Sequence, residues 1–169
     1  MESRVKLFGH PIHPMLIVFP LGLLATGVIF DVLYLFTGNA DFTTASFWMI
    51  TAGILGGLLA AIFGFVDWLA IPGGTRAKAI GLWHGIGNFV IVVLFAISWL
   101  LRRNLPGYAP DGLPFILELA GTVLALITSW LGGELVYRLR VAVDEGAHLD
   151  APSSLSGKPA ASGTRRTAR

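Results

Sequence analysis

The chain of 169 residues contains no cysteine and carries little charge. The lack of cysteine excludes disulfide bonds, thiolate zinc sites, cysteine-ligated iron–sulfur clusters and covalently attached c-type haem. Any metal or haem must therefore be held by histidine, methionine, tyrosine, carboxylate or backbone groups. Charged residues make up only 13% of the chain, too few for the polar surface of a soluble protein of this length.

Hydrophobic residues make up 54% of the sequence, and the mean hydropathy is +0.73. Apolar runs cover about residues 14–37, 42–71, 79–101 and 113–137. Each run has the roughly 20 residues needed to cross a hydrocarbon core of about 30 Å, and backbone groups in lipid must pair within their own segment. We therefore predict an all-α, four-helix transmembrane bundle with short loops over residues 14–143. The first run is too long for a signal-peptide core, so we expect it to be retained.

The flanking segments predict how the bundle is oriented. Residues 1–13 form a short polar segment, and residues 144–169 are rich in Ser, Pro, Ala, Gly and Arg, which predicts a disordered tail. One side of the bundle carries ten of the 12 Lys and Arg residues: Arg4, Lys6, Arg76, Lys78, Arg138, Arg140, Lys158, Arg165, Arg166 and Arg169. Loops and ends rich in Lys and Arg stay in the cytoplasm. This predicts an inner (plasma) membrane protein with both termini cytoplasmic. The basic residues flank lipid-facing spans, so we expect no nucleic-acid partner.

Two Gly-x-x-x-Gly pairs, Gly53 with Gly57 and Gly81 with Gly85, predict close helix packing. The sequence leaves open whether these faces pack within one chain or form a homodimer.

Polar side chains gather at the predicted cytoplasmic ends of the spans. The group consists of His10, His13, Asp67, His84 and Glu134, and Asn88 lies one turn beyond His84. Ionisable groups beside a bilayer are costly and are typical of functional sites. A simpler interpretation pairs Asp67 with Arg76 across a turn and Glu134 with Arg138 at i, i+4 spacing.

Three functions follow from this group. The first is a b-type haem module of electron transfer, with His13 and His84 as axial ligands and Asn88 beside them. The second is a smaller metal site made by His10, His13, Asp67, His84 and Glu134. The third is a scaffold or assembly subunit whose polar layer only holds the helices together. We expect no enzyme, because the sequence contains no nucleophile–base pairing and no phosphate loop.

A second polar group lies at the opposite ends of the spans. Asp31, Glu118, Arg102 and Arg103 predict a charge pair that ties the first and fourth helices to the third. We assign no chemistry to it.

These residues together resemble the DUF2231 family of bacterial four-helix membrane proteins, over about residues 8–143. The resemblance is carried by Phe8-Gly9-His10-Pro11-Ile12-His13-Pro14-Met15-Leu16, Phe30-Asp31, Gly64-Phe65-Val66-Asp67-Trp68 with Ile71-Pro72, His84 with Asn88, and Gly132-Gly133-Glu134-Leu135-Val136-Tyr137. Relatives joined to Rieske-type or cytochrome-type domains imply a redox setting with haem or quinone. This chain has no such domain, so the resemblance implies a separate redox partner. Members commonly carry glycines after the final tyrosine, where this chain has Arg140 and Ala142.

Overall fold

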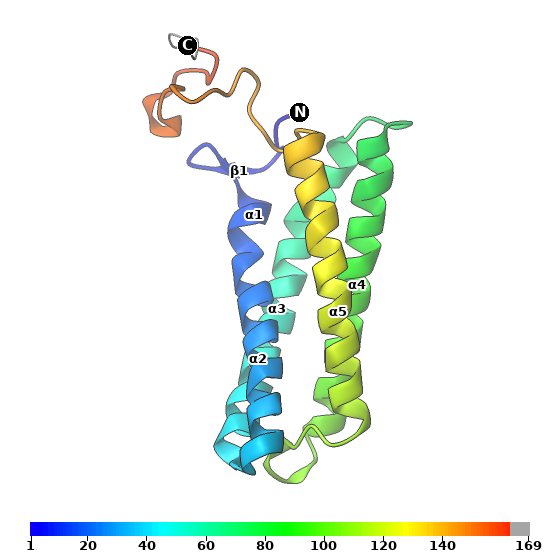
Figure 1. Ribbon diagram of the computed structural model, residues 1–169. Helices are drawn as coiled ribbons and strands as arrows, with labels where there is room; N and C mark the ends of the chain where they lie inside the picture. The colour runs from blue at the N-terminus through cyan, green and yellow to red at the C-terminus, as the bar shows by residue number, and fades with distance from the viewer. Residues whose placement is uncertain (163–169) are drawn as a thin grey trace.

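The computed structural model describes residues 1–162 and forms a bundle of four long helical spans (Figure 1). The spans are α1 (Ile12–Leu16) with α2 (Val18–Thr37), α3 (Ala40–Ala70), α4 (Arg76–Arg102), and α5 (Leu113–Gly133) with the π-helix η2 (Glu134–Arg138). All four are long and apolar enough to cross a membrane. The predicted four-helix bundle is confirmed. Residues 163–169, which include Arg165, Arg166 and Arg169, lie outside the described residues.

Both termini lie at one end of the bundle, here called the terminal end, and the opposite end is called the distal end (Figure 1). Short turns set this up-and-down arrangement. Gly38, with φ of 69°, ends α2 in the left-handed conformation that favours glycine. Asn39 then caps α3 by accepting a hydrogen bond from Asp41 N, and Thr75 caps α4 by accepting one from Lys78 N.

The first span begins two residues earlier than predicted and is interrupted once. Its first helical residue is Ile12, after the extended Pro11, so His13 is helical and does not have the extended backbone expected before a proline. Pro14 fits in the first turn, where a helix needs no backbone N–H. The helical hydrogen-bond pattern is interrupted at Ile17, which keeps right-handed helical backbone, because Pro20 has no N–H to donate to Leu16 O.

A small β-hairpin precedes the bundle, and the sequence did not predict it. Strands β1 (Lys6–Leu7) and β2 (His10–Pro11) pair antiparallel. Phe8 and Gly9 form the turn with φ of 51° and 83°, the positive values that two-residue hairpin turns require. The usual sequence signals for this turn are Asn-Gly and Asp-Gly, and this chain has Phe8-Gly9 there instead.

The bundle interior has apolar clusters towards its two ends. The distal cluster contains Leu24, Val28, Ile50, Ile91 and Phe95, and the terminal cluster contains Ile71, Leu135 and Val141. Helix α2 packs mainly on α3, and α4 mainly on α5. The level between the clusters has small or polar buried residues, Ala60 and Thr128, and no large apolar ones.

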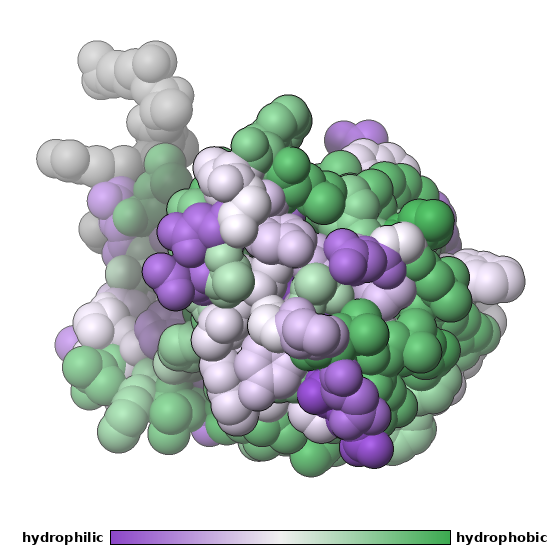
Figure 2. Space-filling view, turned by 90° about the horizontal axis from the view of Figure 1, so that it is seen from below, coloured by the Kyte–Doolittle hydropathy of each residue, from purple (hydrophilic) through white to green (hydrophobic). Residues whose placement is uncertain are grey.

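The sides of the bundle are hydrophobic, as contact with a lipid bilayer requires. Phe36 and Leu126 are examples, with 85% and 70% of their surface exposed. Figure 2, which looks onto the distal end, shows hydrophilic and neutral residues across the middle and hydrophobic residues around the sides.

The predicted glycine faces pack within one chain at three of four positions. A methyl group at Gly53 would meet the side chain of Leu24, and one at Gly81 would meet Trp68. Gly57 faces Val92, whereas a methyl group at Gly85 would meet nothing within 4 Å. Use of these faces in a homodimer stays a prediction.

Between 144 and 162 the chain forms turns and the short 3-10 helix η3 (Ser154–Ser156). The connection to it contains Arg140 and Ala142 with φ of 53° and 62°. Left-handed backbone is costly for residues other than glycine, so both positions carry backbone strain. The Arg140 carbonyl accepts a hydrogen bond from the Met1 amino group at 2.9 Å.

Candidate functional site

His13 lies in the second position of α1 and faces α3. Its Nδ1 is 2.9 Å from the carbonyl oxygen of Ala60. The imidazole lies against Gly64, where a Cβ atom would be only 2.8 Å from His13 Cε1. Glycine at this position therefore makes the space that the ring occupies.

His84 lies two turns into α4 and faces α5 in a matching way. Its Nδ1 is 2.9 Å from the carbonyl oxygen of Thr128, and its ring lies against Gly132. Asn88 follows one turn later and donates from Nδ2 to the backbone oxygen of His84 at 2.8 Å. The same Nδ2 is 3.2 Å from His84 Nε2. Asn88 therefore lies beside the ring, as expected from the i, i+4 spacing.

The two imidazoles are neighbours inside the bundle. Their ring centroids are 6.4 Å apart and their planes are nearly perpendicular, at 88°. They occupy the level between the two apolar clusters. The expectation that His13 and His84 come from separate helices to a common depth agrees with this geometry.

The carbonyl partners determine which ring nitrogen of each histidine can bind a ligand. A carbonyl oxygen only accepts, so Nδ1 of both His13 and His84 must carry the hydrogen. The lone pair is then on Nε2. A backbone carbonyl on Nδ1 is also the usual partner that orients a metal-binding histidine.

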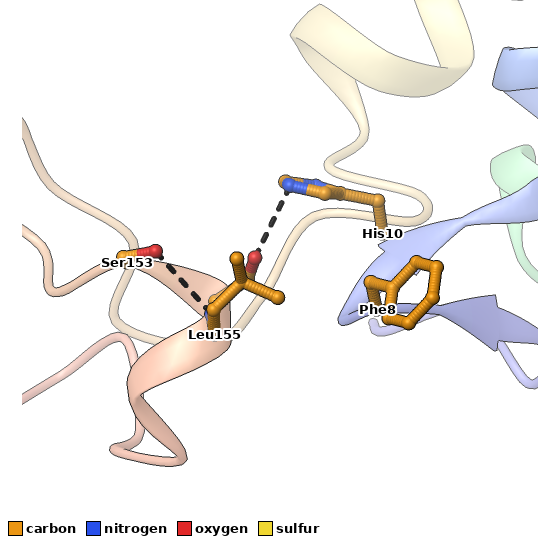
Figure 3. Close-up of a pocket in the computed structure, with 5 residues that line it drawn as sticks. Phe8, His10, Ser153 and Leu155 are labelled. Atoms are coloured by element: carbon orange, nitrogen blue, oxygen red, sulfur yellow. Dashed lines mark hydrogen bonds between the residues drawn. The ribbon is translucent and has the colours of Figure 1, made fainter.

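His10 does not join this pair. Its Nε2 is 3.2 Å from the Ser154 hydroxyl, in a shallow pocket of about 440 Å³ that is lined by Phe8, His10 and the 153–155 turn (Figure 3). The proline after His10 disfavours helical backbone at His10, which lies in strand β2 directly before α1.

Asp67 binds the N-terminal segment. Its carboxylate accepts hydrogen bonds from the Ser3 hydroxyl and the Arg4 backbone N–H, each at 2.8 Å, and only 8% of the residue is exposed. Its predicted partner, Arg76, is bound elsewhere. The pairing of Asp67 with Arg76 was therefore wrong.

Glu134 pairs with Arg76, whose Nη2 is 2.7 Å from Glu134 Oε2. The π-helix at η2 changes the register of the last turn, so the predicted i, i+4 pair with Arg138 is also wrong. Within residues 1–162, no three His, Asp or Glu side chains are grouped so as to hold a metal ion. Of the five predicted metal ligands, only His13 and His84 are neighbours.

The distal polar group is more deeply buried than the sequence indicated. Arg102, Asp31 and Glu118 have no exposed surface, and the Arg102 guanidinium bonds to both carboxylates. The predicted tie between the first, third and fourth helices therefore exists as a buried cluster, while Arg103 is exposed. The signal in the sequence was Asp31 and Glu118 inside apolar runs, with Arg102 directly after the third run.

Comparison with known proteins identifies one matching family model. The model described as "Predicted membrane protein (DUF2231)" matches residues 9–145, most of the chain. No curated protein and no solved structure matches the chain.

Proposed function

Because the chain belongs to the DUF2231 family of predicted membrane proteins, and two imidazoles from separate helices are neighbours in its bundle, we propose that it binds b-type haem through His13 and His84. The observation that carries this proposal is the neighbouring pair of histidines, each anchored through Nδ1 to a backbone carbonyl. The protein would then serve electron transfer within the membrane.

The number of available protein ligands favours haem over a bare metal ion. A structural zinc site needs about four protein ligands. Only His13 and His84 come together, because Asp67 and Glu134 are bound to other partners. In haem, the porphyrin already supplies four nitrogens to the iron. The protein needs to supply only two more ligands, so a pair of histidines is sufficient to bind haem.

The distance between the rings agrees with a shared iron. Two imidazoles that bind one metal from opposite sides, at metal–nitrogen distances of about 2 Å, have ring centroids roughly 6 Å apart. The centroids of His13 and His84 are 6.4 Å apart. Binding would replace the contact of Asn88 Nδ2 with His84 Nε2, and Asn88 would keep its shorter bond to the His84 backbone oxygen.

The two rings occupy space that small residues leave inside the bundle. Gly64 and Gly132 lie against the imidazoles, and no large apolar side chain is buried at this level. His13 belongs to the α1–α2–α3 side of the bundle and His84 to the α4–α5 side, so a group bound by both would join the two helix pairs.

Bound haem would supply one-electron chemistry, and the protein would hold its iron, exclude water and adjust its potential. Burial and hydrogen bonds to the axial histidines are the means by which a protein adjusts that potential. The histidine level is nearer the terminal end, so a separate redox protein would approach from there. We place this end in the cytoplasm because of its excess of Lys and Arg.

The alternative function is a scaffold without a ligand. It is favoured by the fact that each histidine already ties two helices together, His13 joining α1 to α3 and His84 joining α4 to α5. In that case the pair would be a structural polar layer.

The absorption spectrum of protein purified in detergent after expression with ample haem distinguishes the two functions. We expect a Soret band typical of two histidine ligands, with one haem per chain, and its loss in both His13→Ala and His84→Ala. His10→Ala is the control and should keep the band, because His10 contacts Ser154 at the surface. A protein that folds but shows no Soret band, or a band unaffected by either substitution, would exclude the haem proposal and favour the scaffold.

A further inference from the structure

The buried cluster at the distal end has more negative than positive charge. Arg102 is the last residue of α4, Asp31 lies in α2, and Glu118 lies in α5; none has exposed surface. Asp31 and Glu118 each lie about one and a half turns inside their helix ends, at a rise of about 1.5 Å per residue. Water therefore does not screen the cluster.

Asp31 has hydrogen-bond donors for both of its carboxylate oxygens. Arg102 donates from Nη1 to Oδ2 at 2.7 Å and from Nη2 to Oδ1 at 2.8 Å, a two-point contact. The Ser46 hydroxyl donates to Oδ2 at 2.6 Å. Such an arrangement stabilises an ionised carboxylate.

Glu118 has donors for only one oxygen. Its Oε1 accepts from the same Arg102 Nη1 at 2.7 Å and from the Ser98 hydroxyl. Its Oε2 is buried and has no hydrogen-bond partner. An unpartnered oxygen of an ionised carboxylate is very costly in an interior without water.

Among residues 1–162, no second cation pairs with the second carboxylate. The other groups that face the cluster are neutral: the Ser46 and Ser98 hydroxyls, and backbone oxygens of Thr43 and Tyr108, which accept from Arg102. Arg103, the next basic residue along the chain, is exposed. With both carboxylates ionised, the cluster would carry one uncompensated negative charge.

We propose that Glu118 is a proton-binding site, with the proton on Oε2, beside an ionised Arg102–Asp31 pair. The bound proton makes the cluster electrically neutral and replaces the unpartnered anionic oxygen with a hydroxyl group. Two carboxylates close together in one site disfavour double ionisation, so one of them binds a proton more tightly. Both carboxylate oxygens of Asp31 accept hydrogen bonds, whereas Glu118 Oε2 accepts none, so we assign this proton to Glu118.

Infrared spectroscopy of the detergent-purified full chain tests this site directly. At neutral pH we expect a carbonyl band of a protonated carboxylic acid, at higher frequency than the amide I band. The band should shift when glutamate is labelled with ¹³C at its side-chain carboxyl and should be lost in Glu118→Gln. In Glu134→Gln, the control, it should remain, because Glu134 is ion-paired with Arg76 at the other end.

Thermal unfolding provides a second readout. Glu118→Gln replaces a neutral acid with a neutral amide, so the unfolding midpoint should be close to that of the native chain. Asp31→Asn removes an ionised partner of Arg102 and should lower the midpoint clearly. The absence of an acid carbonyl band in the native chain, or a band that shifts only with labelled aspartate, would overturn the proposal. The labelling result holds even if a variant fails to fold.

Discussion

A single missing side chain at Gly64 decides whether the His13 imidazole can lie where it does. The position of a Cβ atom there is 2.8 Å from His13 Cε1 and 2.9 Å from Nδ1, closer than real Cβ contacts allow. A core interior is packed too densely to absorb a methyl group without movement. The ring would have to leave Gly64 and with it the Ala60 carbonyl.

We therefore predict that Gly64→Ala impairs the histidine pair while the bundle stays folded. The expected cost is about 1–3 kcal/mol, the usual range for overpacking. The measurement is the thermal midpoint together with the haem content. Gly85→Ala is the matched control, because it adds a methyl group in the His84 helix where nothing lies within 4 Å. Equal behaviour of the two variants would show that Gly64 is not needed for the ring.

At the scale of an element, the N-terminal segment is fixed to the bundle by Asp67. The carboxylate of this α3 residue accepts hydrogen bonds from the Ser3 hydroxyl and the Arg4 N–H. The hairpin of β1 and β2 comes directly after these two residues in the chain. The segment also leads into α1, so its anchoring helps to position His13. A residue predicted as a ligand thus serves as a tether.

We predict that Asp67→Asn loosens this segment. Loss of a charge-assisted hydrogen bond costs about 2 kcal/mol, which corresponds to roughly thirtyfold more frequent opening. Limited trypsin digestion should show faster cleavage after Arg4. Glu134→Gln should leave that rate unchanged, because Glu134 contacts Arg76 and not the segment. If Asp67→Asn is cleaved at the native rate, Asp67 is not the tether.

The same segment contacts the tail through charges that depend on pH. Lys6 Nζ bonds to Glu2 and Asp144, and the Glu145 N–H bonds to Glu2. The hydrogen bond from Lys6 lowers the pKa of Glu2 below its ordinary value of 4.5, with a further contribution from the Glu145 N–H. The hydrogen bonds to Asp144 and Glu2 raise the pKa of Lys6 above 10.5.

We predict that this contact persists across neutral pH and weakens at both extremes. Because the pKa of Glu2 is lower in the folded chain, Glu2 stabilises the contact fully above pH 4.5. This stabilisation is lost as the pH falls through the lowered pKa of the folded chain. The raised pKa of Lys6 means that its contribution is lost as the pH rises through a value above 10.5. NMR titration of the Glu2 carboxyl carbon checks this, and in Lys6→Met the midpoint should move back towards 4.5. A midpoint unaffected by Lys6→Met would contradict the prediction.

At the scale of the whole molecule, the distribution of Lys and Arg predicts that the terminal end faces the cytoplasm. The lack of cysteine makes single-cysteine labelling straightforward. We expect Asp111→Cys, in the distal loop before α5, to react with a membrane-impermeant maleimide on intact cells. Gly73→Cys, in the loop between α3 and α4, should react only after permeabilisation. The reverse pattern would invert the orientation.

The sequence alone predicted the number of spans, their limits to within a few residues, and the common depth of His13 and His84. It could do so because burial in lipid depends on the length and composition of a segment, and the helical rise converts residue number into depth. The chain reversals follow from equally local signals, such as Gly38 and the caps at Asn39 and Thr75.

Only the tertiary structure decided which polar groups at one depth meet. His10, Asp67 and Glu134 were predicted at the same level as the pair, but they bind Ser154, the N-terminal segment and Arg76. Arg102 likewise turned inwards between Asp31 and Glu118, whereas its neighbour Arg103 stayed outside. The physical reason is that hydrophobic burial has no direction around a helix axis, so rotation is set by side-chain packing and by hydrogen bonds to residues far away in the chain.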